Sequence, residues 1–186
     1  MDIIKVVLFI LGNGVIFYYS LPSLPKPRSH GFYRFFAWEF ILALVMVNFD
    51  VWFRDPFSIT QIMSWILLII AIYLVIHGVM LLRMLGKPRA ESQRGEVPVM
   101  HFEKTTSLVM VGAYRYIRHP LYSSLLFLAW GVFFKDPTYL GATLAAAASL
   151  ALLLTAGKEE DENIRFFGPE YEAYIQKTKM FIPFIF

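Results

Sequence analysis

The sequence predicts an all-α membrane protein, a polytopic helical bundle of about five transmembrane helices whose last two form a short helical hairpin. Of the 186 residues, 58% are hydrophobic and only 17% are charged, whereas a soluble domain is about 45–50% apolar. The apolar residues fall into runs near the roughly 20 residues that a helix needs to cross a bilayer core of about 30 Å. Prolines and charged residues separate these runs.

Three runs in the N-terminal half predict three spans. They cover residues 3–19, 35–53 and 59–85. The first ends at a stretch of three prolines, which cannot continue a helix. The second carries Glu39 and Asp50 and the third carries His77. Polar side chains inside a membrane are either functional or hydrogen-bonded to neighbouring helices, and both interpretations stay open here.

Two further runs predict the hairpin. Residues 122–134 are strongly apolar but too few to cross an average bilayer without tilt or local thinning. Residues 139–156 are rich in Gly and Ala, which let helix backbones approach closely. The intervening Lys135-Asp136-Pro137 predicts a turn. Residues 89–118 are polar and predict a long ordered loop, and loops of that length are usually functional.

The whole chain is expected to form one membrane domain. Its parts are three spans (1–88), a loop (89–121), a hairpin (122–156) and a C-terminal segment (157–186). Basic residues concentrate in the loop and between the first two spans, which by the positive-inside tendency are cytoplasmic. The N-terminal run lacks a signal-peptide cleavage pattern, so we expect a retained span.

Composition also excludes several function classes. The net charge is only +3 and the basic residues lie in short clusters, so nucleic acid is not an expected partner. The chain has no cysteine, which excludes disulfides, thiolate metal ligands and thiol nucleophiles. No metal site is predicted.

Two stretches are rich in polar, charged and aromatic side chains that could form a functional site. In residues 112–122, Arg115 and Tyr116 are typical interfacial anchors. His119 precedes Pro120, which favours an extended residue followed by the first turn of a helix. The amides of that first turn carry partial positive charge and can bind a polar ligand group.

The second dense stretch is an acidic cluster after the last span, at residues 159–162. On charge alone it is better explained as a solvated helix start or a topological cap. An antiparallel hairpin, however, brings His119 and Glu159 to the same end of the bundle.

These stretches together resemble a known family. The sequence Arg118-His119-Pro120-Leu121-Tyr122, followed by Glu159-Glu160 and by Phe167-Gly168-Pro169-Glu170-Tyr171 and Pro183, resembles the isoprenylcysteine carboxyl methyltransferase and phospholipid methyltransferase superfamily. The resemblance covers residues 105–183, and the first three spans match only in character.

The resemblance implies an enzyme with S-adenosylmethionine as methyl donor. Its implied cofactor-binding residues are Ser107, Leu108, Val109, Tyr114, His119, Pro120, Leu121, Tyr122, Glu159 and Glu160. On the acceptor side we expect Arg118, Glu39 and His77. Carboxylates and aromatic faces suit the ribose hydroxyls, the ammonium and the sulfonium of this cofactor. Methyl transfer is an in-line displacement that needs alignment and exclusion of water, and no base is assigned.

One departure from the family bears on the acceptor. Members that accept isoprenylcysteine place an arginine before the Glu pair, where this chain has Thr155-Ala156-Gly157-Lys158. We therefore expect a phospholipid amine or another lipid as acceptor, with an isoprenylcysteine-like carboxylate as the alternative and Lys158 or Lys177 as its partner. Two other interpretations stay open. The first is a non-enzymatic transporter or assembly protein. The second is a nicotinamide-dependent reductase, although the Gly-x-Gly-x-x-Gly pattern of dinucleotide-binding proteins is not present.

Overall fold

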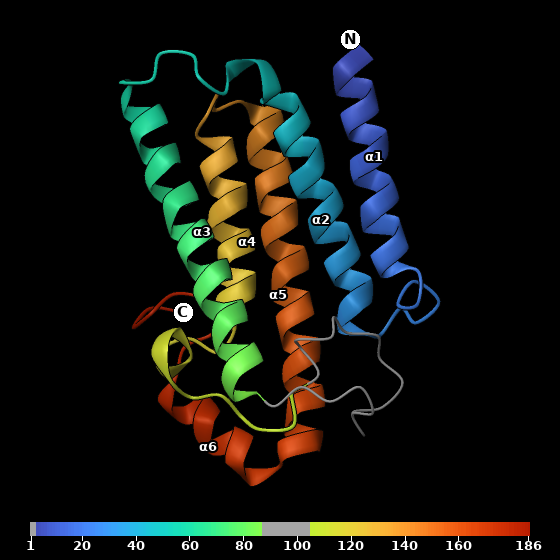
Figure 1. The fold of residues 1–186 in the computed structure, drawn as a ribbon, viewed down its shortest axis with the longest axis vertical. Helices are drawn as coiled ribbons and strands as arrows, with labels where there is room; N and C mark the ends of the chain where they lie inside the picture. The colour runs from blue at the N-terminus through green and yellow to red at the C-terminus, as the bar shows by residue number, and fades with distance from the viewer. Residues whose placement is uncertain (1–2, 87–104) are drawn as a thin grey trace.

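The structure is a computed structural model that describes residues 3–86 and 105–186. Within these residues the regular secondary structure is entirely helical, which confirms the predicted all-α class. The helices form an elongated bundle (Figure 1). They are α1 (Ile3–Ser20), α2 (His30–Val47), α3 (Ile59–Leu85), α4 (Pro120–Phe133), α5 (Tyr139–Phe167) and α6 (Pro169–Lys177).

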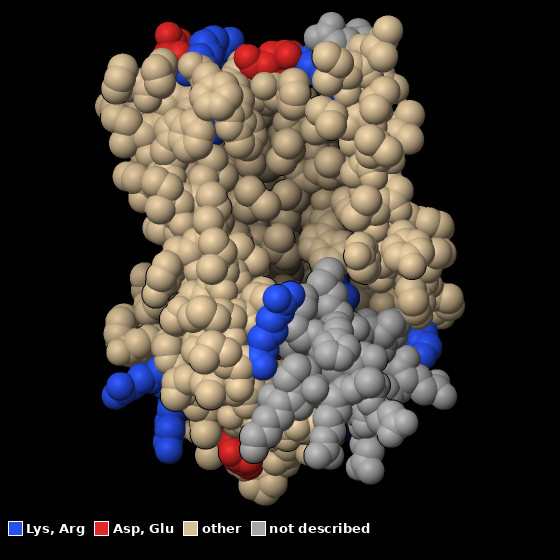
Figure 2. Space-filling view, viewed as in Figure 1, with Lys and Arg blue, Asp and Glu red and all other residues tan. Residues whose placement is uncertain are grey.

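Four of these helices are long and apolar enough to cross a membrane: α1, α2, α3 and α5. The apolar helix α4 is shorter, with 14 residues. Figure 2 shows charged side chains gathered at the two ends of the bundle, with an almost uncharged band between them. This distribution is that of a membrane-embedded bundle. The predicted number of five crossings stays a prediction, because α4 is below spanning length.

The second helix lies earlier in the chain than the predicted span. It begins at His30 because Ser29 caps it, with the hydroxyl accepting a hydrogen bond from the Phe32 amide at 3.3 Å. It ends at Val47, and a 3-10 turn, Phe49–Val51, follows. Hydropathy alone missed the first turns because His30 and Arg34 are polar. The third helix has the predicted bounds.

The fifth helix continues well past its predicted end. The sequence predicts a span to residue 156, but α5 runs through the acidic cluster to Phe167. It stops at Gly168, whose φ of +58° favours glycine, and Pro169 begins α6. Glu159 and Glu160 therefore lie on a rigid helix instead of in a separate tail.

The helices pack in two pairs. α3 lies against α4 and α2 lies against α5, while α4 and α5 also touch and run antiparallel (Figure 1). Among the other helices, only α2 packs appreciably against α1. Small residues of α5 such as Ala145 and Ala148 are fully buried in this core. Their size lets the backbones approach, as predicted from the alanine run.

At one end of the bundle, the turn between α4 and α5 is anchored by a buried lysine. Lys135 is 3% exposed. Its Nζ atom donates to Gln61 Oε1 at 3.0 Å and lies 3.4 Å from the centre of the Trp65 ring. This contact joins the hairpin to the first turn of α3.

Candidate functional site

The start of α4 is held by the C-terminal segment of the chain. The Arg118 amide donates to the Lys179 carbonyl at 2.8 Å, and the His119 amide donates to Met180 at 3.2 Å. His119 is the residue before the helix and Pro120 is its first residue, as the sequence predicts. Two distant parts of the chain thus fix the backbone that carries His119.

A pocket lies at this end of the bundle, below the start of α4. Its walls come from the ends of α3 and α5, from residues 105–122 and from α6. It is lined by Leu82, Thr105, Leu108, Val109, Tyr114, Arg118, His119, Leu121, Tyr122, Glu159, Asn163, Phe167, Tyr171 and Tyr174. Many of these side chains are apolar or aromatic, with a few polar groups among them, which is typical of a small-molecule site.

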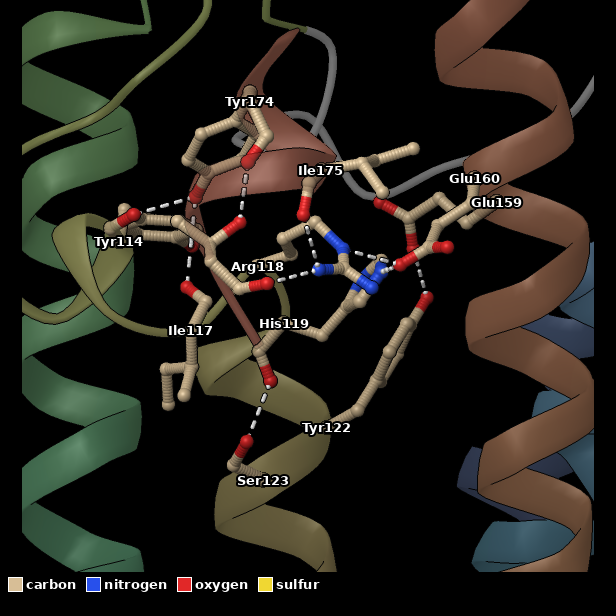
Figure 3. Close-up of polar contacts among 11 residues, drawn as sticks. Tyr114, Ile117, Arg118, His119, Tyr122, Ser123, Glu159, Glu160, Tyr174 and Ile175 are labelled. Carbon is tan, nitrogen blue, oxygen red and sulfur yellow. Dashed lines mark hydrogen bonds and ion pairs between the residues drawn. The ribbon is translucent and has the colours of Figure 1, made fainter. Parts of the chain in front are cut away.

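Glu159 connects α5 to α4 within this pocket. The Tyr122 hydroxyl donates to Glu159 Oε2 at 2.5 Å (Figure 3). The ring of Tyr122 also stacks on His119, with centroids 5.5 Å apart. His119 and Glu159 therefore share one end of the bundle and one pocket, which confirms the proximity that the hairpin predicted.

Glu160 has a different role from its neighbour. Its Oε1 atom accepts from Arg118 Nε at 2.6 Å and lies 3.1 Å from His119 Nε2. The same guanidinium donates to the Thr178 carbonyl at 2.7 Å (Figure 3). Glu160 thus holds the residues that shape the pocket, and it is not one of the lining residues.

Helix α6 closes the pocket on the side away from α4. The Tyr174 hydroxyl donates to the Tyr114 carbonyl at 2.5 Å. Burial raises the pKa of both Tyr171 and Tyr174 above the usual range, and the nearby Glu159 carboxylate raises that of Tyr171 further. Both tyrosines are therefore neutral hydrogen-bond donors at physiological pH.

Most of the residues that the resemblance implies lie in this pocket, and some do not. The lining includes Leu108, Val109, Tyr114, His119, Leu121, Tyr122, Glu159 and Arg118, the last expected on the acceptor side. It does not include Ser107, Pro120, Glu160, Glu39 or His77. The basic residues of 87–104, used to predict orientation, lie outside the described residues.

The three polar residues predicted inside the spans are dispersed. Asp50 forms an ion pair with Lys5 at the opposite end of the bundle. His77 stacks on Tyr73 and lies so close to Gly112 that an added Cβ would come within 2.5 Å of its Nε2 atom. Glu39 is in the middle of α2. Their positions give no continuous polar path through the described bundle.

Sequence reasoning missed several lining residues. Asn163 follows Glu159 by one helical turn, so it belongs to the same face of α5. Phe167 and Tyr171 were quoted in the resemblance but were given no role. Tyr174 follows Tyr171 by three residues in α6 and lies on the same face. The extension of α5 places Asn163 and Phe167 at the site, and α6, which follows directly, adds Tyr171 and Tyr174.

The side chains of the pocket fit S-adenosylmethionine by their chemistry. Tyr114, Phe167 and Tyr171 offer aromatic faces for a purine ring or a sulfonium. Glu159 and Asn163 offer hydrogen-bond partners for hydroxyl and ammonium groups. In the described part of the chain, no group of three or more metal-ligating side chains could hold a metal ion.

Comparisons with known proteins point to methyltransferases. The chain is 32% identical over 125 residues to a probable protein-S-isoprenylcysteine O-methyltransferase of Oryza sativa subsp. indica, and equally to one of subsp. japonica; the match covers 65% of this chain and 63% of each rice protein. It is 26% identical over 178 residues to a methanethiol S-methyltransferase of Crocosphaera subtropica, covering 87% of this chain and 64% of that protein.

The chain therefore spans less than two thirds of the length of the curated relatives that it matches. No family model matches the chain, and no solved structure matches it significantly.

Proposed function

We propose that the chain belongs to the isoprenylcysteine carboxyl methyltransferase-like superfamily and is an integral membrane methyltransferase that transfers a methyl group from S-adenosylmethionine to a lipophilic acceptor. The observation that carries this proposal is the meeting of His119, Tyr122 and Glu159 in one pocket between the ends of α3, α4 and α5. The cofactor supplies an activated methyl group when it is bound.

The residues of the pocket have separate roles in binding. Glu159, oriented by the Tyr122 hydroxyl, is placed to accept hydrogen bonds from the cofactor. His119 is fixed by Glu160 and by the Met180 carbonyl, so it presents a constant face to the pocket. The aromatic side chains of α6 cover one side of the pocket, which favours the alignment of the reacting groups and reduces the solvent reorganisation that displacement at a methyl carbon involves.

The acceptor is proposed to come from the membrane. The pocket lies at the ends of the apolar helices α3 and α5, beside the charged side chains of Arg118 and Glu159, so a lipophilic molecule and a charged cofactor can reach it from different phases. The names of the relatives do not support the phospholipid amine that the sequence favoured. They concern an isoprenylcysteine and a small thiol. We place the pocket on the cytoplasmic side, following the basic residues.

Binding of S-adenosylhomocysteine, measured by calorimetry on protein in detergent and in lipid, tests the proposal. A charge-assisted hydrogen bond contributes about 1.5–3 kcal/mol, so Glu159→Gln should weaken binding by about tenfold or more. Asp161→Asn is the matched control, because this carboxylate lies two residues later in α5 and pairs with Lys158 at the surface. Absence of binding to the natural chain would refute the proposed function.

A further inference from the structure

A cluster of apolar side chains beside the start of α4 is left exposed by the rest of the described chain. After α6 the chain returns to α4 and forms a tight turn, the C-terminal turn (residues 181–186). In this turn Phe184 is 82% exposed and Ile185 is 75% exposed. The stretch from Met180 to Phe186 contains no charged residue. Exposed apolar patches mark surfaces that contact a partner or a membrane.

The C-terminal turn is firmly attached to the bundle. Phe181 is fully buried and packs in a core cluster with Tyr122. The Ser123 hydroxyl donates to the Phe181 carbonyl at 2.8 Å. The amides of Phe181 and Ile182 both donate to the main-chain oxygen of Phe186, at 2.8 Å and 2.6 Å. These bonds close the turn and fix it against the first turn of α4.

The shortness of α4 sets the depth of this turn in the membrane. Lys135 follows α4 and donates to Gln61 in the first turn of α3, so the two helices are level at that end. From there α4 rises about 21 Å, whereas the hydrocarbon core is about 30 Å thick. The start of α4 at Pro120 therefore lies at a depth that lipid covers. The C-terminal turn is bonded to this start, and Figure 1 shows the C-terminus at the height of the lower part of α3, above α6.

The neighbours of the turn are side chains typical of a membrane interface. The centre of the Phe184 ring lies 5.9 Å from that of the Tyr116 ring. The Arg115 guanidinium also lies 5.9 Å from the centre of the Tyr116 ring, and Lys179 is exposed on the segment that leads into the turn. Aromatic rings flanked by Arg and Lys side chains are typical of the headgroup level. This composition matches lipid as the partner of the turn.

The backbone of Phe184 also favours an environment outside the chain. Its φ of +66° lies in the left-handed region, which a bulky residue rarely adopts. Strained residues of this kind are kept where the conformation serves a function. Here the conformation leaves the aromatic ring mostly outside the packed chain. Contact with water is unfavourable for such a ring, whereas contact with lipid is favourable.

We propose that the C-terminal turn is a membrane anchor, with Phe184 and Ile185 inserted among lipids at the pocket end of the bundle. The segment that leads into the turn accepts hydrogen bonds from the amides of Arg118 and His119. Contact between the turn and lipid therefore steadies the backbone that carries His119. The C-terminal segment does not stay in water along its whole length but returns to the membrane at residues 181–186.

Spin labels on single cysteines test the position of the turn, because the natural chain has no cysteine. In phosphatidylcholine and phosphatidylglycerol vesicles, labels at Phe184→Cys and Ile185→Cys should collide with dissolved oxygen more often than with a water-soluble nickel chelate. Ile69→Cys, on an exposed apolar side of α3, is the lipid reference. Glu172→Cys, exposed on α6, is the water reference and should show the reverse order.

Nickel collisions at both turn positions as frequent as at Glu172→Cys would place the turn in water and overturn the proposal. Low collision rates with both reagents would overturn it as well, because they would mean that protein covers the turn, for example a second copy of the chain. Ile185→Cys keeps the test decisive if the strained backbone at Phe184 does not tolerate the label.

Hydrogen exchange tests whether lipid contact steadies the start of α4. The double variant Phe184→Asp, Ile185→Asp removes both apolar side chains, and Asp tolerates a positive φ better than Phe does. The amides of Arg118 and His119 should then exchange about tenfold faster or more in the vesicles. Phe57→Asp, at a similarly exposed residue of the opposite end, should leave this exchange unchanged.

Equal exchange in the double variant and in the natural chain would contradict the anchor. Neither measurement uses the cofactor, so both outcomes are independent of the proposed function.

Discussion

Glu159 and Glu160 are adjacent, yet the helix turns their side chains toward different neighbours. Successive residues of an α-helix are about 100° apart around its axis. Glu159 therefore faces Tyr122 and the pocket, while Glu160 faces Arg118 and, through it, the carbonyl of Thr178. In the proposed function, Glu159 is the carboxylate that binds the cofactor and Glu160 is the one that positions Arg118 and His119. Removing the charge of Glu159 should therefore affect the site differently from removing the charge of Glu160.

The lysine between α4 and α5 is the residue-scale anchor of the opposite end. Lys135→Met should keep most of the packing but leave Gln61 Oε1 without its donor and remove the cation from the Trp65 ring. We expect a loss of about 1–3 kcal/mol of stability. It should appear as a lower melting temperature, followed by tryptophan fluorescence in detergent.

Arg54→Gln is the control for this change. Arg54 pairs with Asp136 at 3.4 Å near the same turn, but its side chain is 60% exposed. Exposed ion pairs contribute at most about 1 kcal/mol. A larger effect of Arg54→Gln than of Lys135→Met would show that burial does not determine the anchoring.

Among the elements, α6 is attached mainly through its tyrosines. Tyr171 and Tyr174 are buried on one face of this nine-residue helix. An isolated helix of that length is unstable in water. Its stability therefore comes from packing on α5 and from the bond to the Tyr114 carbonyl. The closing wall of the pocket depends on these few contacts.

The attachment of α6 should weaken in alkali. Because burial raises the pKa of Tyr171 and Tyr174 above the value of about 10 in an unfolded chain, the folded state holds their protons longer. Stability is then complete below pH 10 and falls as the pH rises above it. Tyr174→Phe should lower stability by about 1 kcal/mol at neutral pH and make the alkaline fall shallower.

Melting temperatures across this pH range, with tyrosinate absorbance, measure the effect. Tyr139→Phe is the control, since this side chain is 96% exposed and begins α5 at the other end. An alkaline fall that is equally steep in Tyr174→Phe and in the natural chain would contradict the role of Tyr174.

The elements differ in how well the sequence predicted them. The third helix could be predicted to the residue because a long apolar run lies between an Arg-Asp-Pro turn and a Gly-Lys-Pro stop. The fifth could not, because hydropathy ends at the membrane while backbone hydrogen bonding continues through charged residues to Gly168. For the same reason the motif located Glu159, whereas Asn163 and Tyr174 needed the three-dimensional helix. The contact of His30 with α5 is long-range and left no local pattern.

At the scale of the whole molecule, the bundle has the pocket at one end and the Lys135 anchor at the other. The end of α3, the start of α4, the end of α5 and α6 meet around the pocket (Figure 1). The Lys135 anchor and the Lys5–Asp50 pair belong to the opposite end. This polarity requires that α4 connects both ends despite its 14 residues.

The alternation of the helices across the membrane can be tested directly, because the chain has no cysteine. Five crossings place residues 28 and 172 on one side of the membrane and residue 54 on the other. A membrane-impermeant maleimide should therefore label Arg28→Cys and Glu172→Cys from the same face of sealed vesicles and Arg54→Cys only from the opposite face. All three exposed positions are suitable. Labelling of all three from one face would mean that the helices do not alternate across the bilayer.

The shortness of α4 has a mechanical consequence. Helix α4 rises about 21 Å, against about 40 Å for α3 beside it, so the bundle has a step at the level of Pro120. A bilayer matched to α3 is thicker than α4 and must thin, or be met by protein, around that step. A change in membrane thickness should therefore act on the first turn of α4, which adjoins the pocket, so that lipid composition can alter the geometry of the pocket.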